Sequence, residues 1–273
     1  MGESTKNRFG ARIIGIVTAS NRYDPALWDA LAECDAAEFR ADGFEPSRIS
    51  EEAFAFRRDC AERFGNPLET FLTLRLKRDG GAWPDAEASR RKEVWQSLGL
   101  AGKEPACDWI DVEMEEIDFL SPQVKSLLRP EGPKLLLSHH DFGKSRTRAE
   151  LKVMVRKMHS HRPDGMKFAL TCGDRTELQE LLVFAQDLAK ATPNGALLSM
   201  GREGRTSRVL TPMLGCPFTY GYLTGGAVAP GQLSARDLNA FFRGLTGNEA
   251  EGRTESDLVD WAEARIEGDT LAD

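Results

Sequence analysis

The stretch Asp164-Gly165-Met166-Lys167-Phe168-Ala169-Leu170 decides the fold and the chemistry that this sequence predicts. Its apolar residues predict a buried β-strand, and Lys167 lies in the middle of them. Lysine is rarely buried unless its head group is paired or used. Burial disfavours the charged form of an amine, and an uncharged amine is a nucleophile that forms Schiff bases with carbonyl compounds. The alternative interpretation is an edge lysine whose head group reaches water.

Similar apolar runs recur along the chain, and segments with helical patterns separate most of them. The predicted strands cover residues 12–19, 36–41, 70–76, 107–114, 134–138, 164–170, 196–200 and 217–222. The predicted helices begin at Asp24-Pro25 and at Ser121-Pro122, and cover 47–64, 85–98, 147–161, 176–191, 234–245 and 254–266. Eight strands alternating with helices over roughly 250 residues predict an α/β protein of the (β/α)8 TIM-barrel class. A doubly wound open sheet is the alternative.

One globular barrel domain is expected over residues 1–246, followed by a polar helical tail over residues 247–273. A net charge of −7 over 273 residues disfavours a nucleic-acid partner. No segment approaches the roughly 20 apolar residues of a membrane span, and the first residues do not resemble a secretory signal. Five scattered cysteines without a CxxC pair favour reduced thiols in a cytoplasmic protein over disulfides or a zinc site.

Charged residues lie in or just beyond the predicted strands, where a barrel carries its site. Glu38 and Arg40 are two residues apart on one strand, so both side chains point to the same face. They indicate a polar site floor, although a structural salt bridge in the barrel is the alternative. Asp111 and Glu113 repeat this spacing, and a structural role is the preferred interpretation for them. The full set of candidates is Glu38, Arg40, Arg75, Asp79, Asp111, Glu113, His140, Lys167 and Arg208.

Five stretches of the chain together resemble type I 3-dehydroquinate dehydratase, the Schiff-base class of dehydroquinase. They are Glu38-Phe39-Arg40-Ala41-Asp42, Thr73-Leu74-Arg75 with Asp79-Gly80-Gly81, Ser138-His139-His140-Asp141-Phe142, the Lys167 strand, and Ser199-Met200-Gly201 through Ser207-Arg208 to Ala229-Pro230-Gly231-Gln232. Each motif is weak alone, but their order and spacing are specific. The resemblance extends from about residue 12 to residue 245.

The resemblance implies a barrel lyase of the shikimate pathway that converts 3-dehydroquinate to 3-dehydroshikimate and water. Lys167 matches the lysine that forms the imine with the substrate ketone. His140 matches the general acid and base, a task that suits histidine because its pKa is near neutral. Asp79 occupies the position of a glutamate that orients this histidine. The neighbouring His139 points to the opposite face of the strand and is expected to be a packed or surface residue.

The resemblance also implies a set of substrate-binding residues. Glu38, Arg40 and Arg75 would bind the substrate hydroxyls and hold the floor of the site. Arg208 would pair with the substrate carboxylate through its guanidinium. The remaining matches are Gln232 in the lid, and Met200 and Tyr220 in the pocket wall, with Tyr220 at a position where the family usually has phenylalanine. The family implies no cofactor and no metal, and a small-molecule substrate. A homodimer is possible because two-fold dimers are the commonest oligomers of soluble proteins.

Two departures from the family pattern leave other functions open. Asp79 is one methylene shorter than glutamate, which puts its hydrogen bond to His140 in doubt. Val228 replaces the usual serine of the lid and cannot donate to the substrate carboxylate. A catalytically impaired dehydroquinase-like binding or regulatory protein is therefore one alternative. Another Schiff-base lyase or aldolase on the same fold is a second, because the fold alone does not define the reaction.

Overall fold

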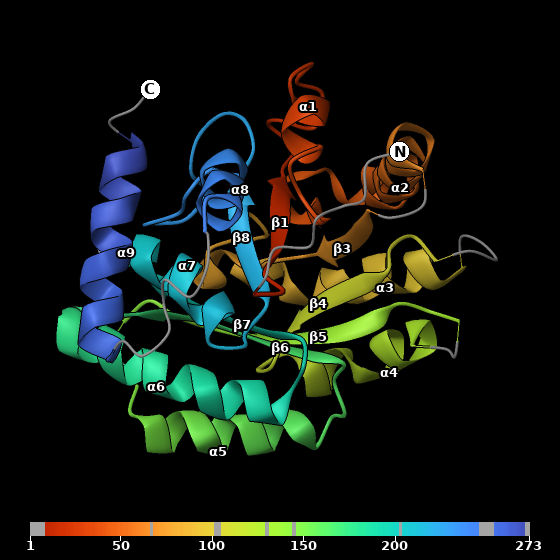
Figure 1. Ribbon diagram of the computed structural model, residues 1–273. Helices are drawn as coiled ribbons and strands as arrows, with labels where there is room; N and C mark the ends of the chain where they lie inside the picture. The colour runs from red at the N-terminus through yellow and green to blue at the C-terminus, as the bar shows by residue number, and fades with distance from the viewer. Residues whose placement is uncertain are drawn as a thin grey trace.

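The computed structural model describes residues 9–65, 68–100, 105–128, 131–143, 146–201, 204–245 and 254–270 (Figure 1). The strands are β1 (Arg12–Val17), β2 (Ala36–Arg40), β3 (Glu69–Thr73), β4 (Trp109–Glu113), β5 (Lys134–Asp141), β6 (Gly165–Thr171), β7 (Gly195–Met200) and β8 (Phe218–Tyr222). The α-helices are α1 (Leu27–Leu31), α2 (Ile49–Phe64), α3 (Arg91–Leu100), α4 (Ile117–Leu127), α5 (Arg148–His159), α6 (Arg175–Ala191), α7 (Gly204–Met213), α8 (Ala235–Arg243) and α9 (Glu255–Thr270). Short 3-10 turns are η1 (Ala41–Gly43), η2 (Pro46–Arg48), η3 (Lys77–Asp79) and η4 (Asp85–Arg90).

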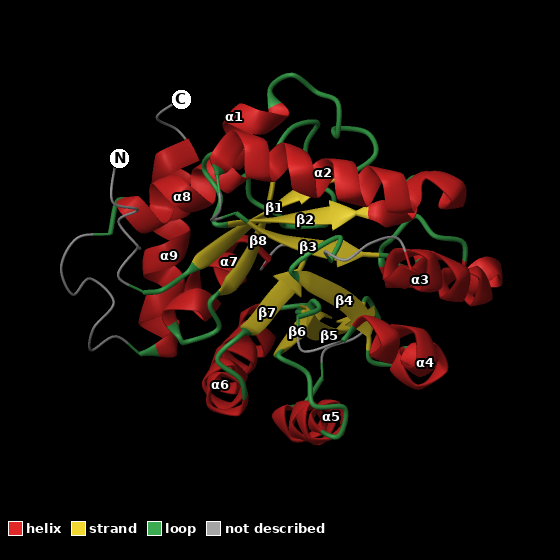
Figure 2. Cartoon of the chain, turned by 90° about the vertical axis from the view of Figure 1, so that its right-hand side faces the viewer, coloured by secondary structure: helices red, strands yellow, loops and turns green. Residues whose placement is uncertain are grey.

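The strands form one parallel sheet in the order β7-β6-β5-β4-β3-β2-β1-β8. The two end strands, β7 and β8, contact each other, so the sheet curls into a nearly closed barrel. Figure 2 shows the strands enclosed by the helices. The predicted (β/α)8 barrel is therefore confirmed, and the alternative of an open doubly wound sheet is wrong.

The inward side chains change character along the strands. Toward the amino ends they are apolar and form a compact plug in which Phe71 stacks on Trp109 with ring centroids 5.3 Å apart and Phe218 meets both edge-on. Two residues further along, the inward positions of β2, β4 and β6 carry Glu38, Asp111 and Lys167. The aromatic plug closes one end of the barrel, so these polar side chains form the floor of a space that opens at the carboxyl ends.

Two predicted helix starts are wrong. Asp24-Pro25 does not begin α1, because Asp24 Oδ1 accepts a hydrogen bond from the Ala26 N–H in a turn and the helix begins at Leu27. Ser121-Pro122 does not begin α4 either, since the helix starts at Ile117 and contains Pro122. The buried face of α4, formed by Ile117, Leu120, Val124 and Leu127, has helical spacing. Packing of this face outweighs the proline, which removes one backbone hydrogen bond.

The helix α7 is not among the predicted elements, and α9 falls in the predicted tail. α7 is almost completely buried, and α9 packs against it and against α6 and α8 (Figure 1). α9 buries Leu258, Val259, Ala262 and Ile266. Burying one Leu, Val or Ile side chain is worth about 1.5–3 kcal/mol, so α9 is held firmly on the barrel. Residues 247–253 and 271–273 of the predicted tail lie outside the described residues. No helix in the described ranges is long and apolar enough to cross a membrane.

Candidate active site

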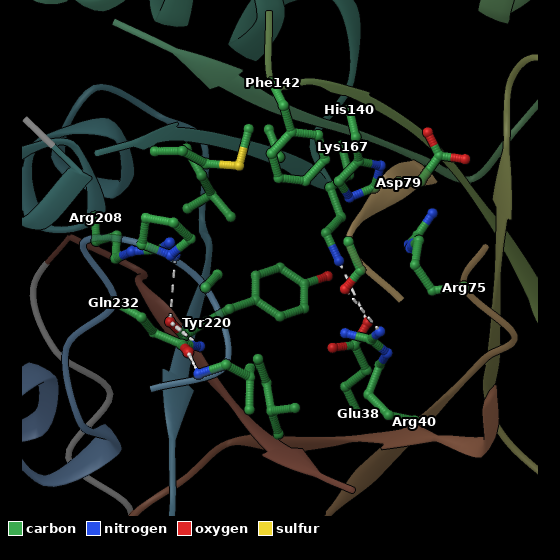
Figure 3. Close-up of a pocket in the computed structure, with 18 residues that line it drawn as sticks. Glu38, Arg40, Arg75, Asp79, His140, Phe142, Lys167, Arg208, Tyr220 and Gln232 are labelled. Carbon is green, nitrogen blue, oxygen red and sulfur yellow. Dashed lines mark hydrogen bonds and ion pairs between the residues drawn. The ribbon is translucent and has the colours of Figure 1, made fainter. Parts of the chain in front are cut away.

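All ten candidate site residues in the resemblance line a single cavity at the carboxyl ends of the strands (Figure 3). They are Glu38, Arg40, Arg75, Asp79, His140, Lys167, Met200, Arg208, Tyr220 and Gln232. The cavity has a volume of about 90 Å³ and is open to solvent. Residues separated by up to 194 positions in the sequence (38 to 232) are thus brought to one site.

Lys167 is buried in this cavity, with 5% of its surface exposed. Its Nζ lies 3.3 Å from Glu38 Oε1 and 3.2 Å from Asp111 Oδ2. The same amine lies 3.9 Å from the centroid of the Tyr220 ring. The interpretation of Lys167 as an edge lysine that reaches water is therefore wrong. Two carboxylates and one aromatic face hold the amine at the floor of the cavity.

Asp111 links the lysine to a second buried cation. Its Oδ2 lies 2.6 Å from Arg75 Nη2, and its Oδ1 accepts a hydrogen bond of 2.5 Å from Ser138 Oγ. Arg75 Nη1 also donates to Ser138 Oγ at 2.7 Å and lies 3.4 Å from Glu113. Burial alone would raise the pKa of Asp111, but the charges of Arg75 and Lys167 outweigh it and hold this pKa well below the usual range. Asp111 is therefore ionised, and besides its ion pair it helps to position Lys167.

Glu38 and Arg40 lie side by side at the floor, as their spacing predicts, but they are not paired with each other. Glu38 Oε1 accepts a 2.8 Å hydrogen bond from Thr73 Oγ1 as well as contacting Lys167. Arg40 instead makes a two-pronged contact with Asp42, at 2.8 and 2.9 Å, and donates to the Gly80 carbonyl at 3.3 Å. The salt-bridge alternative for Glu38 with Arg40 is therefore wrong, since each has another partner.

His140 lies beside Lys167, but Asp79 makes no hydrogen bond to it in the part of the chain that the structure describes. His140 Nδ1 is buried without a partner there. Burial, reinforced by Arg75 and Lys167, lowers the pKa of His140 well below its usual value, so the imidazole is uncharged at neutral pH. The Asp79 carboxylate is instead 3.6 Å from Arg78 Nε. The Phe142 ring packs against Gly80, next to Asp79, and limits where η3 can lie.

The carboxyl group of Asp79 ionises less readily in the folded protein than in water. Burial, together with the Glu113 charge, raises its pKa from 3.8 to about 6 despite Arg75 and Arg78. The raised pKa means that the ionised group destabilises the folded state above pH 6, and that this penalty disappears below about pH 4. We therefore expect Asp79→Asn to raise the thermal midpoint at pH 8 by about 3 °C.

The same measurement at pH 5 tests the cause of this gain, because Asp79 is then largely protonated and the benefit should shrink. Asp29→Asn, on an exposed part of α1, is the matched control and should show neither effect. A gain of equal size at both pH values would contradict the proposed origin in the Asp79 charge.

The opposite side of the cavity holds a buried cation with no counter-charge in the part of the chain that the structure describes. Arg208, on α7, donates from Nε to the Gly231 carbonyl at 3.1 Å and from Nη1 to the Tyr220 carbonyl at 3.5 Å. Within the described ranges no carboxylate lies within ion-pair distance of it. Burial lowers the pKa of Arg208 to about 10, so it is still charged at neutral pH. An anion in the cavity would supply the missing partner.

The lid segment is tied to this arginine through Gln232. Gln232 Nε2 donates to the Tyr220 carbonyl at 3.4 Å, and its Oε1 accepts from the Val228 N–H at 2.9 Å. Val228 itself is 41% exposed at the cavity rim and offers only its apolar side chain there. The glutamine therefore holds the loop in place over the arginine.

Sequence reasoning did not assign three residues near the site to ligand binding. It gave Asp111 a structural role and did not single out Ser138 or Phe142. Asp111 contacts the lysine, Ser138 connects Asp111 to Arg75, and Phe142 lines the mouth. The alternation of side chains along β4 and β5 could have identified Asp111 and Ser138, because both point to the same face of the sheet as Lys167. His139 points the other way, is buried against Phe168 and lies 2.6 Å from Glu115 Oε1. The described residues contain no cluster of three His, Cys, Asp or Glu side chains suited to a metal ion.

The fold and the cavity define a (β/α)8-barrel enzyme with a buried amine at one end of its site. At the other end lies an arginine that has no carboxylate partner among the described residues. Comparison with known families agrees with this class. The sequence model of the family described as type I 3-dehydroquinase matches residues 15–249. The chain therefore belongs to the type I 3-dehydroquinase family.

Individual relatives named 3-dehydroquinate dehydratase match this chain over most of their own length. The chain is 30% identical over 196 residues to 3-dehydroquinate dehydratase from Dehalococcoides mccartyi, which covers 69% of this chain and 80% of that protein. It is 28% identical over 225 residues to the Hydrogenobaculum enzyme of this name, covering 82% and 94%. The solved type I 3-dehydroquinate dehydratase from Clostridium difficile has a TM-score of 0.71 at 21% identity, covering 85% of this chain and 91% of that one. This structural similarity supports the fold.

Proposed function

We propose that this protein dehydrates 3-dehydroquinate to 3-dehydroshikimate through an imine on Lys167, as a lyase of the shikimate pathway. Membership of the type I 3-dehydroquinase family supports the reaction. The observation that carries the proposal is the pairing of functions in one cavity. A buried amine faces the place where a ketone would bind. Arg208, which has no carboxylate partner in the described ranges, faces the place where a carboxylate would bind. The substrate has both groups.

The proposed chemistry begins when the Lys167 amine attacks the ketone carbon and water leaves, which forms a protonated imine. The imine withdraws electrons, so the neighbouring C2 proton becomes acidic. The uncharged His140 imidazole accepts this proton. The C1 hydroxyl then leaves and takes a proton from His140, which makes the second water. Hydrolysis of the imine consumes one water, releases 3-dehydroshikimate and restores the amine.

The other candidate residues complete the proposed site. Glu38, Arg40 and Arg75 would face the substrate hydroxyls, while Met200 and Tyr220 form the wall. Asp79 is proposed as the carboxylate that orients His140, which requires η3 to move toward β5 when substrate binds. Gln232 is proposed to close the lid over Arg208.

We expect Arg208→Gln to lower kcat/KM by about a hundredfold, mainly through KM, because a charged hydrogen-bonding partner of the carboxylate is lost. Steady-state kinetics with 3-dehydroquinate measure this. Arg208→Lys should recover part of the loss, since it keeps the charge but not the two-pronged geometry. Arg236→Gln, an exposed position on α8, is the control. Unchanged KM in Arg208→Gln would show that the carboxylate binds elsewhere.

The decisive test of the function is reduction with borohydride in the presence of 3-dehydroquinate. Intact mass should increase by the mass of the reduced substrate or product, and peptide mapping should place the adduct on Lys167. Formation of the conjugated enone in solution should follow in parallel. Folded protein that forms no adduct and no product would refute the proposal. Binding of 3-dehydroquinate without turnover would favour the binding-protein alternative.

We further infer that the protein works in the cytoplasm on this small molecule alone, and as a homodimer. The scattered thiols and the acidic charge support the first inference. Closed two-fold dimers are the commonest oligomers of soluble enzymes, which supports the second. Light scattering coupled to size-exclusion chromatography tests it, and a mass equal to one chain of 30.2 kDa would refute it.

A further inference from the structure

The buried hydroxyl group of Tyr220 lacks a hydrogen-bond partner among the described residues. Tyr220 is 2% exposed, and among the described residues its Oη is buried without a hydrogen bond. A buried tyrosine hydroxyl normally finds a partner. The cavity beside it is the place where a bound molecule would lie, so the missing acceptor is expected on the ligand.

The position of the Tyr220 ring indicates which end of a bound ligand would lie beside its hydroxyl group. The backbone carbonyl of Tyr220 accepts hydrogen bonds from Arg208 and Gln232 at 3.5 and 3.4 Å. The ring extends away from them, and its centroid lies 3.9 Å from Lys167 Nζ. Figure 3 shows the hydroxyl directed toward the Lys167 side of the cavity. The phenol therefore faces the reacting carbon rather than the carboxylate.

The carboxylates that flank the amine cannot serve as donors there. Asp111 is ionised, and an ionised carboxylate only accepts hydrogen bonds. Glu38 already accepts from Thr73 Oγ1 and contacts Lys167. Arg75 is engaged with Asp111 and Ser138. Among these side chains, the Tyr220 hydroxyl is the donor whose hydrogen is not already used.

We propose that Tyr220 Oη donates a hydrogen bond to the ketone oxygen while Lys167 attacks the ketone carbon. The inference rests on the proposed function and adds a catalytic residue for its first step. The amine lone pair forms the N–C bond, and the carbonyl π pair moves to oxygen. That oxygen takes the proton that the amine releases. The phenol stabilises the charge that develops on oxygen and keeps its own proton.

The surroundings of Tyr220 keep it in the form that can donate. Burial, with the negative charges of Glu38 and Asp111, raises its pKa well above 10. The phenol is therefore protonated at neutral pH. The resemblance places phenylalanine at this position in the family, so the donor is a property of this chain.

The test is Tyr220→Phe, which keeps the ring and removes only the hydroxyl. Excess enzyme is mixed with 3-dehydroquinate and reduced with borohydride at successive times, and adduct mass is followed. We expect the rate of adduct formation to fall about tenfold, while the final adduct on Lys167 is unchanged. The thermal midpoint should stay equal or rise, because the variant removes an unsatisfied buried hydroxyl. Tyr23→Phe removes an exposed phenol that bonds Glu52 and is the matched control.

Each other result has a definite meaning. An unchanged rate of adduct formation in Tyr220→Phe, with an active wild type, would overturn the role of Tyr220 and leave the proposed function intact. A lower rate together with a lower thermal midpoint would make Tyr220 a packing residue and also overturn it. A wild type that forms no adduct would refute the proposed function itself.

Discussion

Lys167→Ala is expected to abolish turnover of 3-dehydroquinate, with a loss of at least about 10⁴-fold in kcat. The reason is that, among the described residues lining the cavity, no other side chain supplies an amine: the groups around Nζ are Glu38, Asp111 and the Tyr220 ring. Without the imine, the C2 proton stays too weakly acidic for removal. Enone formation measures the loss, and borohydride should give no adduct.

The substitution also removes a cation from between two buried carboxylates, so its effect on folding needs its own control. Loss of one partner of a buried ion pair costs about 3–5 kcal/mol, and Arg75, Thr73 and Ser138 reduce this because they still contact the carboxylates. Lys167→Arg keeps the positive charge but is not a nucleophile, so it should be more stable than Lys167→Ala and equally inactive. Lys190→Ala on the exposed side of α6 should behave as wild type. Wild-type kcat in either Lys167 variant would refute the imine mechanism.

His140→Ala is expected to lower kcat by about 10²–10⁴-fold, the usual contribution of a positioned general acid or base. Its imidazole is uncharged at neutral pH because its pKa is lowered, and it lies in the same cavity as Lys167. Attack by the amine comes before proton removal in the proposed sequence. Borohydride should therefore still trap an adduct on Lys167, while the enone forms slowly.

The neighbouring histidine provides the matched control for this experiment. His139→Ala removes the same ring from the same strand, but on the face that lies against Phe168 and Glu115. We expect it to lower stability and to leave kcat within a few fold of wild type. Equal losses of kcat in the two variants would show that His140 acts through the structure of β5 rather than on the proton.

The alternation of the strands made much of the barrel and its floor predictable. Side chains two residues apart on a strand point to the same face. This geometry explains the spacing of Glu38 and Arg40 and the place of Lys167 within an apolar run. The eight strands of the sheet appear where apolar runs predicted them, with ends that shift by a few residues. The local sequence pattern is sufficient to predict these strands because burial inside a barrel requires apolar side chains along each of them.

Other features depend on tertiary packing and were not predictable. α7 contains Thr206, Ser207, Thr211 and Pro212, which are poor helix formers, and its burial between the barrel and α9 outweighs their propensities. The lack of a hydrogen bond between Asp79 and His140 depends on the position of η3. The contact of Phe142 with Gly80 limits that position, and this contact cannot be predicted from the spacing of residues in the sequence.

The two carboxylates beside Lys167 have a consequence for the whole reaction cycle. In the proposed sequence the nitrogen becomes positive as a protonated imine, at a place that Glu38 and Asp111 already flank before substrate binds. These carboxylates do not have to be brought in when the covalent bond forms, so the polar layer of the empty barrel is already arranged to stabilise the intermediate.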